Sequence, residues 1–536
     1  GETTANVDIL AFHFYRARSW EKGFSYSLEA AQQSYRAYSL TECSRYFRQC
    51  LDILEGSGEN DLEIEKKLRF YKSYTDFLVL EGRYSEAYGM FRAWRRLGKT
   101  SGQVHESLLA ATEAARLLWQ QSRYSTSRYF LERVLAFRHT PGEEKVAAKA
   151  YTIMAELDRR AGKFKQAQQW CTKAIDIAAC NNDHQALADA HNKLGLALWG
   201  EGRLAEAAAS YEKSLELSED YDSMYAQAKT SNNLAIVQWE RGDFLVAEEL
   251  MTRALAVFRD IGDRRNETYA SGNLANLYRI FGKLVEAEKL FRRADLIFTR
   301  LGDRHAHYYT VGNIGDIDLI RGDLQSAEGK YRQVSEFAES VDDKELTSEC
   351  GVRFGELAFF RNEIDEAESW YNRAMKMAKA IGSAEYYIRG CIGLARLQIG
   401  RRNREKAMLL INTILNEAEK NNAIIAQNEG IFLKGEFFRI SGQAEEAEKC
   451  YRRVLKYAQQ QRVFELILKS AMRLYELDSS SRQSSTTILQ RLAREFAEKN
   501  GQKSFNEILD SAYFSHFNPT MQEIFSGNQL VFANRP

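Results

Sequence analysis

The sequence predicts an all-α protein built as an α-solenoid of about ten helical hairpins, each 40 residues long. Only three prolines, Pro141, Pro519 and Pro536, interrupt 536 residues, and proline is the strongest helix breaker. Hydrophobic residues make up 44% and charged residues 28%, as in soluble folded proteins. A similar turn segment also recurs at a fixed period, which is typical of repeat architectures.

The turn segments define the repeat. "FGKLVEAEKLF" is one of ten related segments, and their second residues are spaced 40 apart without insertion, at 82, 122, 162, 202, 242, 282, 322, 362, 402 and 442. Five positions after each mark stands a small residue: Ala87, Ser127, Ala167, Ala207, Ala247, Ala287, Ala327, Ala367, Ala407 and Ala447. Small residues at helical spacing let two antiparallel helices approach closely. Each unit is therefore predicted to be a hairpin of a helix A and a helix B, whose apolar faces are buried when neighbours stack.

The repeat resembles the tetratricopeptide family. The resemblance rests on the bulky–small pair of helix A, such as Leu274 and Ala275, and on an Ala-x3-Phe/Tyr-x2-Ala run in helix B, such as Ala287, Phe291 and Ala294. The repeat is longer than the family's usual length of about 34 residues, and the frequent proline at the end of helix B is absent. The resemblance implies a right-handed superhelix whose concave wall is formed by the A helices.

The pattern divides the chain into five parts. Residues 1–64 are expected to form irregular helical hairpins, in which Cys43 and Phe47 take the small and large positions of a repeat. The superhelix covers 65–478, a Ser-rich link 479–487, capping helices 488–517 and an irregular tail 518–536. Capping helices are expected because a solenoid must cover its last apolar face.

The N-terminal stretch from Ala11 to Leu54 resembles the junction that opens the helical-repeat sensor of bacterial multidomain signalling ATPases of the STAND type, which include cyclase-linked and kinase-linked members. In those proteins a nucleotide-switch domain precedes a superhelix of roughly 40-residue repeats. The resemblance implies that this chain is the C-terminal sensor part of a longer protein.

Charge and composition exclude several partners. Lys plus Arg and Asp plus Glu number 74 each, so nothing predicts nucleic acid or an anionic membrane as the main partner. No apolar run approaches the roughly 20 residues of a membrane helix. The seven cysteines are scattered without a CxxC pair, which favours a reducing, cytoplasmic compartment.

The sequence carries only weak motifs for nucleotide binding, metal binding or catalysis. "LGKT" at Leu97–Thr100 ends like a phosphate-binding loop, but Ala93 stands where the first glycine is required. His305 and His307 form an HxH without further ligands at useful spacing, so a solvated loop is favoured over a metal site. We therefore predict no catalytic residue, no metal and no cofactor. An enzyme whose site is dispersed over distant repeats remains the alternative.

A polar stripe on helix A is the candidate ligand site. Its positions follow steps of three and four, which keep one helical face. Asparagine can both donate to and accept from a peptide backbone, tyrosine adds apolar area with a polar tip, and arginine can bind a carboxylate or phosphate in a forked geometry. The predicted ligand-binding residues are Asn233, Tyr269, Asn273, Asn276, Tyr309, Asn313, Asp316, Arg353 and Glu356.

The leading hypothesis is a non-enzymatic binding module that captures a protein or peptide segment in the concave groove, as the sensor arm of a signalling protein. An intramolecular switch domain is a second expected partner. Two alternatives stay open beside the dispersed enzyme: a scaffold that uses its convex face or edges, its asparagines serving only inter-repeat hydrogen bonds, and a sensor of a small-molecule effector.

Overall fold

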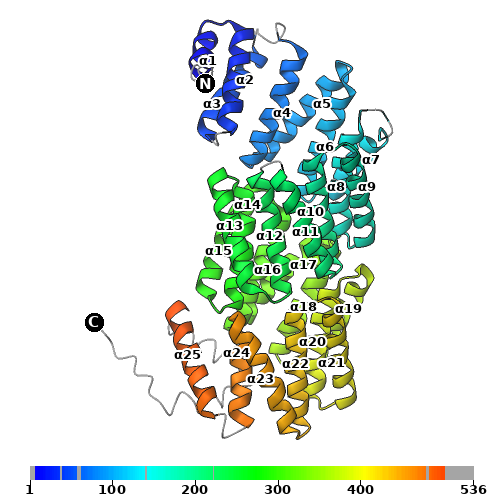
Figure 1. Ribbon diagram of the computed structural model, residues 1–536, viewed down its shortest axis with the longest axis vertical. Helices are drawn as coiled ribbons and strands as arrows, with labels where there is room; N and C mark the ends of the chain where they lie inside the picture. Colours follow the sequence, from blue (N-terminus) through cyan, green and yellow to red (C-terminus); the bar gives the residue numbers. More distant parts are fainter. Residues whose placement is uncertain are drawn as a thin grey trace, which may run out of the picture.

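The structure is a computed structural model that describes residues 7–36, 39–56, 62–138, 140, 142–220, 223–477 and 482–500. These residues form 25 α-helices and no strand. In Figure 1 the chain descends from the N-terminal helices at the top to α25 at the lower left. The predicted all-α solenoid of helical hairpins is confirmed.

Ten hairpins follow the predicted 40-residue period. Their A helices are α4 (Ile64–Leu80), α6 (Val104–Gln120), α8 (Glu144–Arg160), α10 (His184–Gly200), α12 (Met224–Glu240), α14 (Arg264–Ile280), α16 (Arg304–Arg321), α18 (Lys344–Phe360), α20 (Ala384–Gly400) and α22 (Ile424–Ile440). Their B helices are α5 (Tyr84–Thr100), α7 (Tyr124–Leu135), α9 (Phe164–Cys180), α11 (Leu204–Asp220), α13 (Phe244–Ile261), α15 (Leu284–Leu301), α17 (Leu324–Ser340), α19 (Ile364–Ile381), α21 (Arg404–Lys420) and α23 (Ala444–Gln461).

Five further helices flank the ten hairpins: α1 (Val7–Arg16), α2 (Trp20–Arg36), α3 (Leu40–Glu55), α24 (Phe464–Leu477) and α25 (Arg482–Asn500). Cys43 and Phe47 on α3 are fully buried. Helix α24 begins 40 residues after α22 and therefore continues the spacing of the A helices. Because α25 already begins at Arg482, residues 482–487 of the expected Ser-rich link are helical instead. The second expected capping helix and the tail 518–536 lie outside the described residues.

Each hairpin is closed by contacts between small and large residues. All ten small positions on the B helices, from Ala87 to Ala447, are fully buried. On helix A, glycine occurs opposite a tyrosine of helix B: a Cβ at Gly195 would lie 2.7 Å from the Tyr211 ring, and one at Gly355 would lie 2.5 Å from Tyr371. Where helix B carries Met251 instead, helix A carries alanine. The tyrosine ring thus occupies the space that the glycine leaves open.

Short links join consecutive hairpins. Helix α13 ends at Ile261 and is capped by Gly262, whose φ of 77° is the left-handed conformation that glycine adopts without a Cβ penalty. The next residue, Asp263, caps α14 by accepting a hydrogen bond from the backbone N–H of Asn266. Gly302 and Asp303 do the same between α15 and α16. The links between these hairpins therefore have a defined geometry.

The superhelix closes on itself. The turn between α12 and α13 contacts the end of α23, since Tyr457 Oη donates to the Gly242 carbonyl at 3.3 Å and the Phe244 N–H donates to Gln461 Oε1 at 3.2 Å. The turn between α14 and α15 likewise holds Asn500 of α25, which donates to the Gly282 carbonyl at 2.6 Å. These pairs are 215 to 218 residues apart. Successive turns of the superhelix are therefore packed together, and they enclose the space between the A helices.

Candidate functional site

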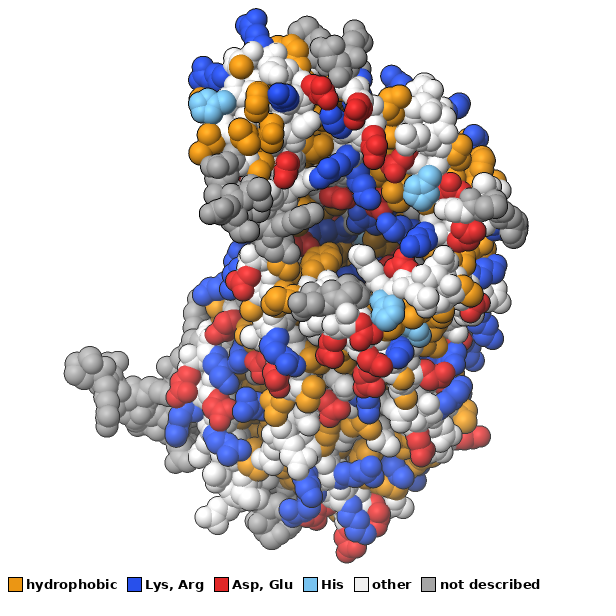
Figure 2. Space-filling view, turned by 45° about the horizontal axis from the view of Figure 1, so that its top comes forward, with side chains coloured by type: hydrophobic (Ala, Val, Ile, Leu, Met, Phe, Trp, Pro, Cys, Tyr) orange, Lys and Arg blue, Asp and Glu red, His pale blue; other side chains and the backbone are white. Residues whose placement is uncertain are grey.

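A cavity of about 1250 Å³ lies inside the superhelix. Most of the residues that line it belong to the A helices from α4 to α22, with contributions from α24 and α25. Figure 2 shows the surface hollowed below the N-terminal helices, with Lys and Arg side chains near the rim and hydrophobic side chains within. The face of helix A that the sequence leaves polar is therefore turned toward this cavity.

Eight of the nine predicted residues line this cavity. They are Asn233, Tyr269, Asn273, Asn276, Tyr309, Asn313, Asp316 and Glu356. Two of them are almost completely enclosed: Asn276 is 2% exposed and Asn313 is 3% exposed. The predicted stripe is thus a wall of the cavity, and the ninth residue, Arg353, is set behind it.

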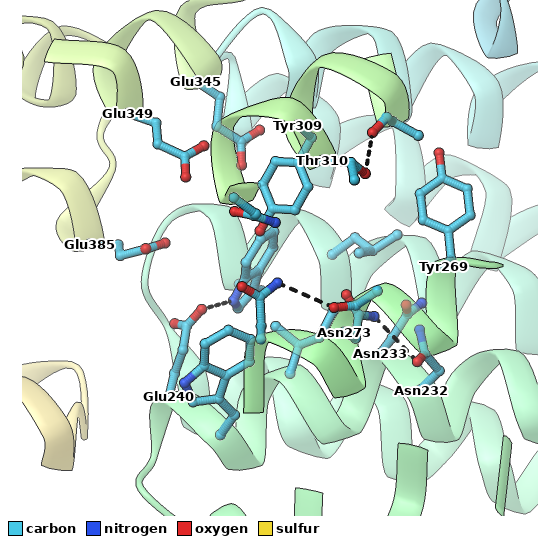
Figure 3. Close-up of a pocket in the computed structure, with 18 of the residues that line it drawn as sticks. Asn232, Asn233, Glu240, Tyr269, Asn273, Tyr309, Thr310, Glu345, Glu349 and Glu385 are labelled. Carbon is cyan, nitrogen blue, oxygen red and sulfur yellow. Dashed lines mark hydrogen bonds between the residues drawn. The ribbon is translucent and has the colours of Figure 1, made fainter. Parts of the chain in front are cut away.

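Two asparagines of the stripe hydrogen-bond to the preceding repeat. Asn273 Nδ2 donates to Asn232 Oδ1 at 3.3 Å, and Asn233 Nδ2 donates to Asn192 Oδ1 at 3.1 Å. Each bond therefore joins the stripe to the residue one step around the preceding A helix, and Figure 3 shows the bond between Asn273 and Asn232. Within the described residues no group donates to Oδ1 of Asn233 or Asn273, so each side chain keeps an acceptor for a ligand.

Arg353 does not face the cavity, which corrects the expectation that it binds a ligand carboxylate. It is 1% exposed, and its guanidinium donates to Asp316 Oδ1 at 2.9 Å and to Asn313 Oδ1 at 3.0 Å. It also lies 3.1 Å from Glu349. The guanidinium packs over Gly312, where a Cβ would collide with it. Arg353 therefore holds Asn313 and Asp316 in position rather than a ligand.

The two predicted tyrosines differ in their hydrogen bonds. Tyr269 Oη donates to Asp303 Oδ2 at 2.9 Å, the same oxygen that accepts from Arg265 at 2.5 Å. Tyr309 has no hydrogen-bond partner within the described residues, and it stands in the middle of the cavity wall (Figure 3). Burial, reinforced by the charge of Glu349, raises the pKa of Tyr309 above its ordinary value, so its hydroxyl stays protonated at neutral pH.

Sequence reasoning missed two groups in the cavity. The first is a set of tryptophans, Trp119, Trp199 and Trp239, which recur at multiples of the 40-residue period and could have been found by it. The second is a set of four glutamates, Glu240, Glu345, Glu349 and Glu385. Glu240 accepts a hydrogen bond from Trp199 Nε1 at 2.5 Å. The glutamates come from three A helices that are distant in sequence, α12, α18 and α20, so no local pattern brings them together.

The two histidines of the HxH motif lie close to two different carboxylates. They lie in the first turn of α16, where His305 Nε2 is 3.2 Å from Asp343 and His307 Nδ1 is 2.6 Å from Asp295. Across the described residues, no group of three or more His, Cys, Asp or Glu side chains is arranged to hold a metal ion. Among the helices that could be searched there, none is long and apolar enough to cross a membrane.

Antiparallel helical hairpins that repeat at a fixed period and stack into a superhelix are typical of the tetratricopeptide class of repeat proteins. Within that class, the model of the MalT-like TPR region matches residues 179–479, more than half of the 536 residues, and the chain belongs to this family. The tetratricopeptide resemblance predicted from the repeat is thereby confirmed. No curated protein sequence matches the chain.

Three solved structures of low sequence identity are similar to parts of this chain. A Rap protein complexed with competence and sporulation factor is 15% identical, with a TM-score of 0.47, over 68% of this chain and 100% of that one. Aspartyl phosphate phosphatase F from Bacillus subtilis is 12% identical, with a TM-score of 0.40, over 67% and 94%. A STAND protein with a tetratricopeptide repeat sensor from Pyrococcus horikoshii is 15% identical, with a TM-score of 0.37, over 62% of this chain and 51% of that one.

Proposed function

We propose that this chain is a non-enzymatic binding module that captures a peptide segment inside the superhelix. The observation that carries the proposal is the pair Asn233 and Asn273, whose amides line the cavity and keep unpaired acceptors beside their inter-repeat bonds. Such acceptors can take backbone N–H groups of a peptide whatever its side chains.

The cavity also has the size and lining that a peptide needs. Its volume of about 1250 Å³ exceeds the roughly 300–1,000 Å³ of pockets for small ligands. Trp199, Trp239 and Ile236 supply apolar surface next to the asparagines. Aromatic side chains of this kind contribute most of the energy in peptide and protein recognition.

The enclosure of the cavity suggests how binding is transmitted. A segment held between two superhelical turns binds the closed superhelix more tightly than an opened one, and only such a difference in affinity shifts a conformational equilibrium. In a STAND-type protein this shift is the signal that the sensor arm passes to a switch domain.

The test uses a synthetic library of random decapeptides and the double variant N233A/N273A. We expect the wild-type chain to select peptides, and the variant to bind the selected peptides at least about tenfold more weakly, because each lost hydrogen bond contributes about 1 kcal/mol. The matched control is N372A/N412A, which removes two exposed asparagines from the B helices α19 and α21. Unchanged binding by N233A/N273A, or no peptide selected by the wild type, contradicts the proposal.

Thermal unfolding of the same variant distinguishes the scaffold alternative from peptide binding. If the asparagines serve only inter-repeat bonds, N233A/N273A lowers the melting temperature and no library peptide protects the wild type. If they bind a ligand as well, the selected peptides raise the melting temperature of the wild type and of N372A/N412A, but not that of N233A/N273A.

A further inference from the structure

Four carboxylates converge on one side of the cavity. Glu240 ends α12, Glu345 and Glu349 lie at the start of α18, and Glu385 lies at the start of α20. Figure 3 shows these four side chains on one side of the cavity, with Asn232, Asn233 and Asn273 on the other. A ligand held by the asparagines is therefore within the same enclosed space as the carboxylates.

The cations near these carboxylates are shared with other acidic groups. Arg159 lies 2.9 Å from Glu345 but also 3.2 Å from Glu156. Arg353 is likewise shared between Glu349 and Asp316, at 3.1 and 2.9 Å.

The remaining two glutamates are weakly compensated. Arg389 lies 3.6 Å from Glu385. Glu240 has no cation within 4 Å in the described part of the chain, and its one hydrogen bond comes from the neutral indole of Trp199. The arginines within 4 Å therefore do not by themselves compensate all four carboxylates.

The unpaired hydroxyl of Tyr386 is an independent observation that points to a ligand beside these carboxylates. Its side chain is 7% exposed, it lines the cavity, and its neighbours include Glu349, Glu385 and Glu345. Its hydroxyl has no hydrogen-bond partner within the described residues, although a buried tyrosine hydroxyl normally has one. An unpaired polar group that opens on the cavity is the kind of group that a ligand completes.

We infer that Glu240, Glu345, Glu349 and Glu385, with the Tyr386 hydroxyl, form a subsite for a cationic group, and that it takes a lysine or arginine side chain of the captured peptide. This inference rests on the proposed function, because the asparagines hold the backbone of the same peptide. The stem of such a side chain packs on Trp199 and Tyr309, whose faces also attract a cation.

The titration of the glutamates agrees with this subsite. Burial, with the nearby charges of Glu385 and Glu345, raises the pKa of Glu240 well above its ordinary value. Burial, reinforced by Glu349 and Glu345, also raises the pKa of Glu385 to about 7. Protons compensate these carboxylates when no further cation is present, and an incoming ammonium or guanidinium group replaces them.

The spacing of the carboxylates favours an organic cation over a metal ion. Within the described residues, no three of them are close enough to hold a metal. A guanidinium carries five N–H donors in a fork, and an ammonium carries three at the end of a flexible stem, so either can reach separated carboxylates and the tyrosine oxygen.

The first experiment uses the decapeptides that the wild-type chain selects. We expect them to be enriched in Lys or Arg, and replacement of that residue by norleucine or citrulline to weaken binding at least about tenfold. In E240Q/E385Q the charged and neutral peptides should bind with similar affinity. The control E212Q/E405Q removes two exposed glutamates from α11 and α21 and should keep the full difference.

The outcomes separate this inference from the proposed function. Peptides that lose affinity in N233A/N273A but show no dependence on charge overturn the cationic subsite and leave peptide capture intact. If no peptide is selected, peptide capture fails, and the subsite is tested alone with millimolar Nα-acetylarginine amide against its citrulline analogue. A rise in the wild-type melting temperature with the arginine compound only, absent in E240Q/E385Q, supports the subsite; equal shifts overturn it.

Discussion

Arg159 on α8 donates from Nη1 to Glu345 Oε2 on α18 at 2.9 Å, across 186 residues of sequence. Both side chains are nearly enclosed, with 6% and 11% of their surface exposed. The pair links two turns of the superhelix at the wall of the cavity. It therefore connects the closure of the array directly to the candidate site.

Replacing Arg159 should break the ion pair that links these two superhelical turns. In R159M, Glu345 loses its only ion-pair partner in the described residues, and an uncompensated buried charge costs about 3–5 kcal/mol. We expect a clearly lower unfolding midpoint in urea and a larger radius of gyration in solution scattering. The control R253M breaks the exposed Arg253–Glu249 pair, which contributes less than about 1 kcal/mol. Equal shifts for the two variants would show that the link carries no stability.

Alanine at Gly202 should disturb the packing between superhelical turns. Gly202 has a φ of +83°, and a Cβ there would lie 2.5 Å from Ala384 Cβ of the next turn. Gly442 has a similar φ of +77° but no atom within 4 Å of such a Cβ. Both substitutions pay the conformational cost of a left-handed alanine, about 1 kcal/mol. Only G202A should also expand the molecule in solution scattering, and an unchanged radius would contradict tight packing at this turn.

Asn500 hydrogen-bonds the described C-terminal end to the turn between α14 and α15, beside the apolar packing of Leu492 and Phe496. Asn500 accepts from the Val285 N–H at 3.0 Å and donates to the Gly282 carbonyl, and its side chain is buried. N500A leaves these two backbone groups unpaired, at a cost of about 1–3 kcal/mol. We expect faster amide exchange in 482–500 and 282–285, measured by mass spectrometry. N412A, on the exposed side of α21, should leave exchange in both segments unchanged.

The glutamates of the cavity should make stability depend on pH. The pKa of Glu385, about 7 in the folded protein, lies above its ordinary value near 4.3. Between these values the folded chain holds a proton that the unfolded chain has lost, so stability falls as pH rises through this window.

Glutamine removes this penalty because it does not ionise. E240Q/E385Q should match the wild type near pH 4.5 and melt about 1–2 °C higher at pH 8, the effect being modest because Glu385 is partly exposed and screened. Scanning calorimetry at both values measures the difference. Arg389, Glu345 and Glu349 remain in both proteins, so a variant that is less stable at pH 8 would mean that these groups already compensate the charge.

The repeat could be predicted closely from sequence because it is a local property. The spacing of glycines and small residues fixes each hairpin, and A helices begin at 64, 104, 144 and every 40 residues to 464. The same register placed the polar stripe on the concave side, so residues such as Asn273 and Asp316 line the cavity as expected.

The details of the site could not be predicted because they depend on the superhelix. Whether Arg353 faces a ligand or a neighbour is decided by the space over Gly312 in the adjacent repeat. The meeting of Glu240 with Glu345 depends on how many repeats complete one turn, which is set by small rotations accumulated over many interfaces. The periodicity of a single repeat therefore does not predict the total rotation of the superhelix.

The contacts between superhelical turns have a consequence for the length of the array. Partners such as Gly242 and Tyr457 are 215 residues apart, about five and a half repeats, so A–B turns meet the ends of B helices rather than other A–B turns. Deleting a whole 40-residue unit between them would preserve every hairpin yet bring each turn against the side chains of a different repeat. Gain or loss of repeats, the usual way in which solenoids change during evolution, therefore requires a compensating change at every such contact. This array is constrained in copy number as well as in sequence.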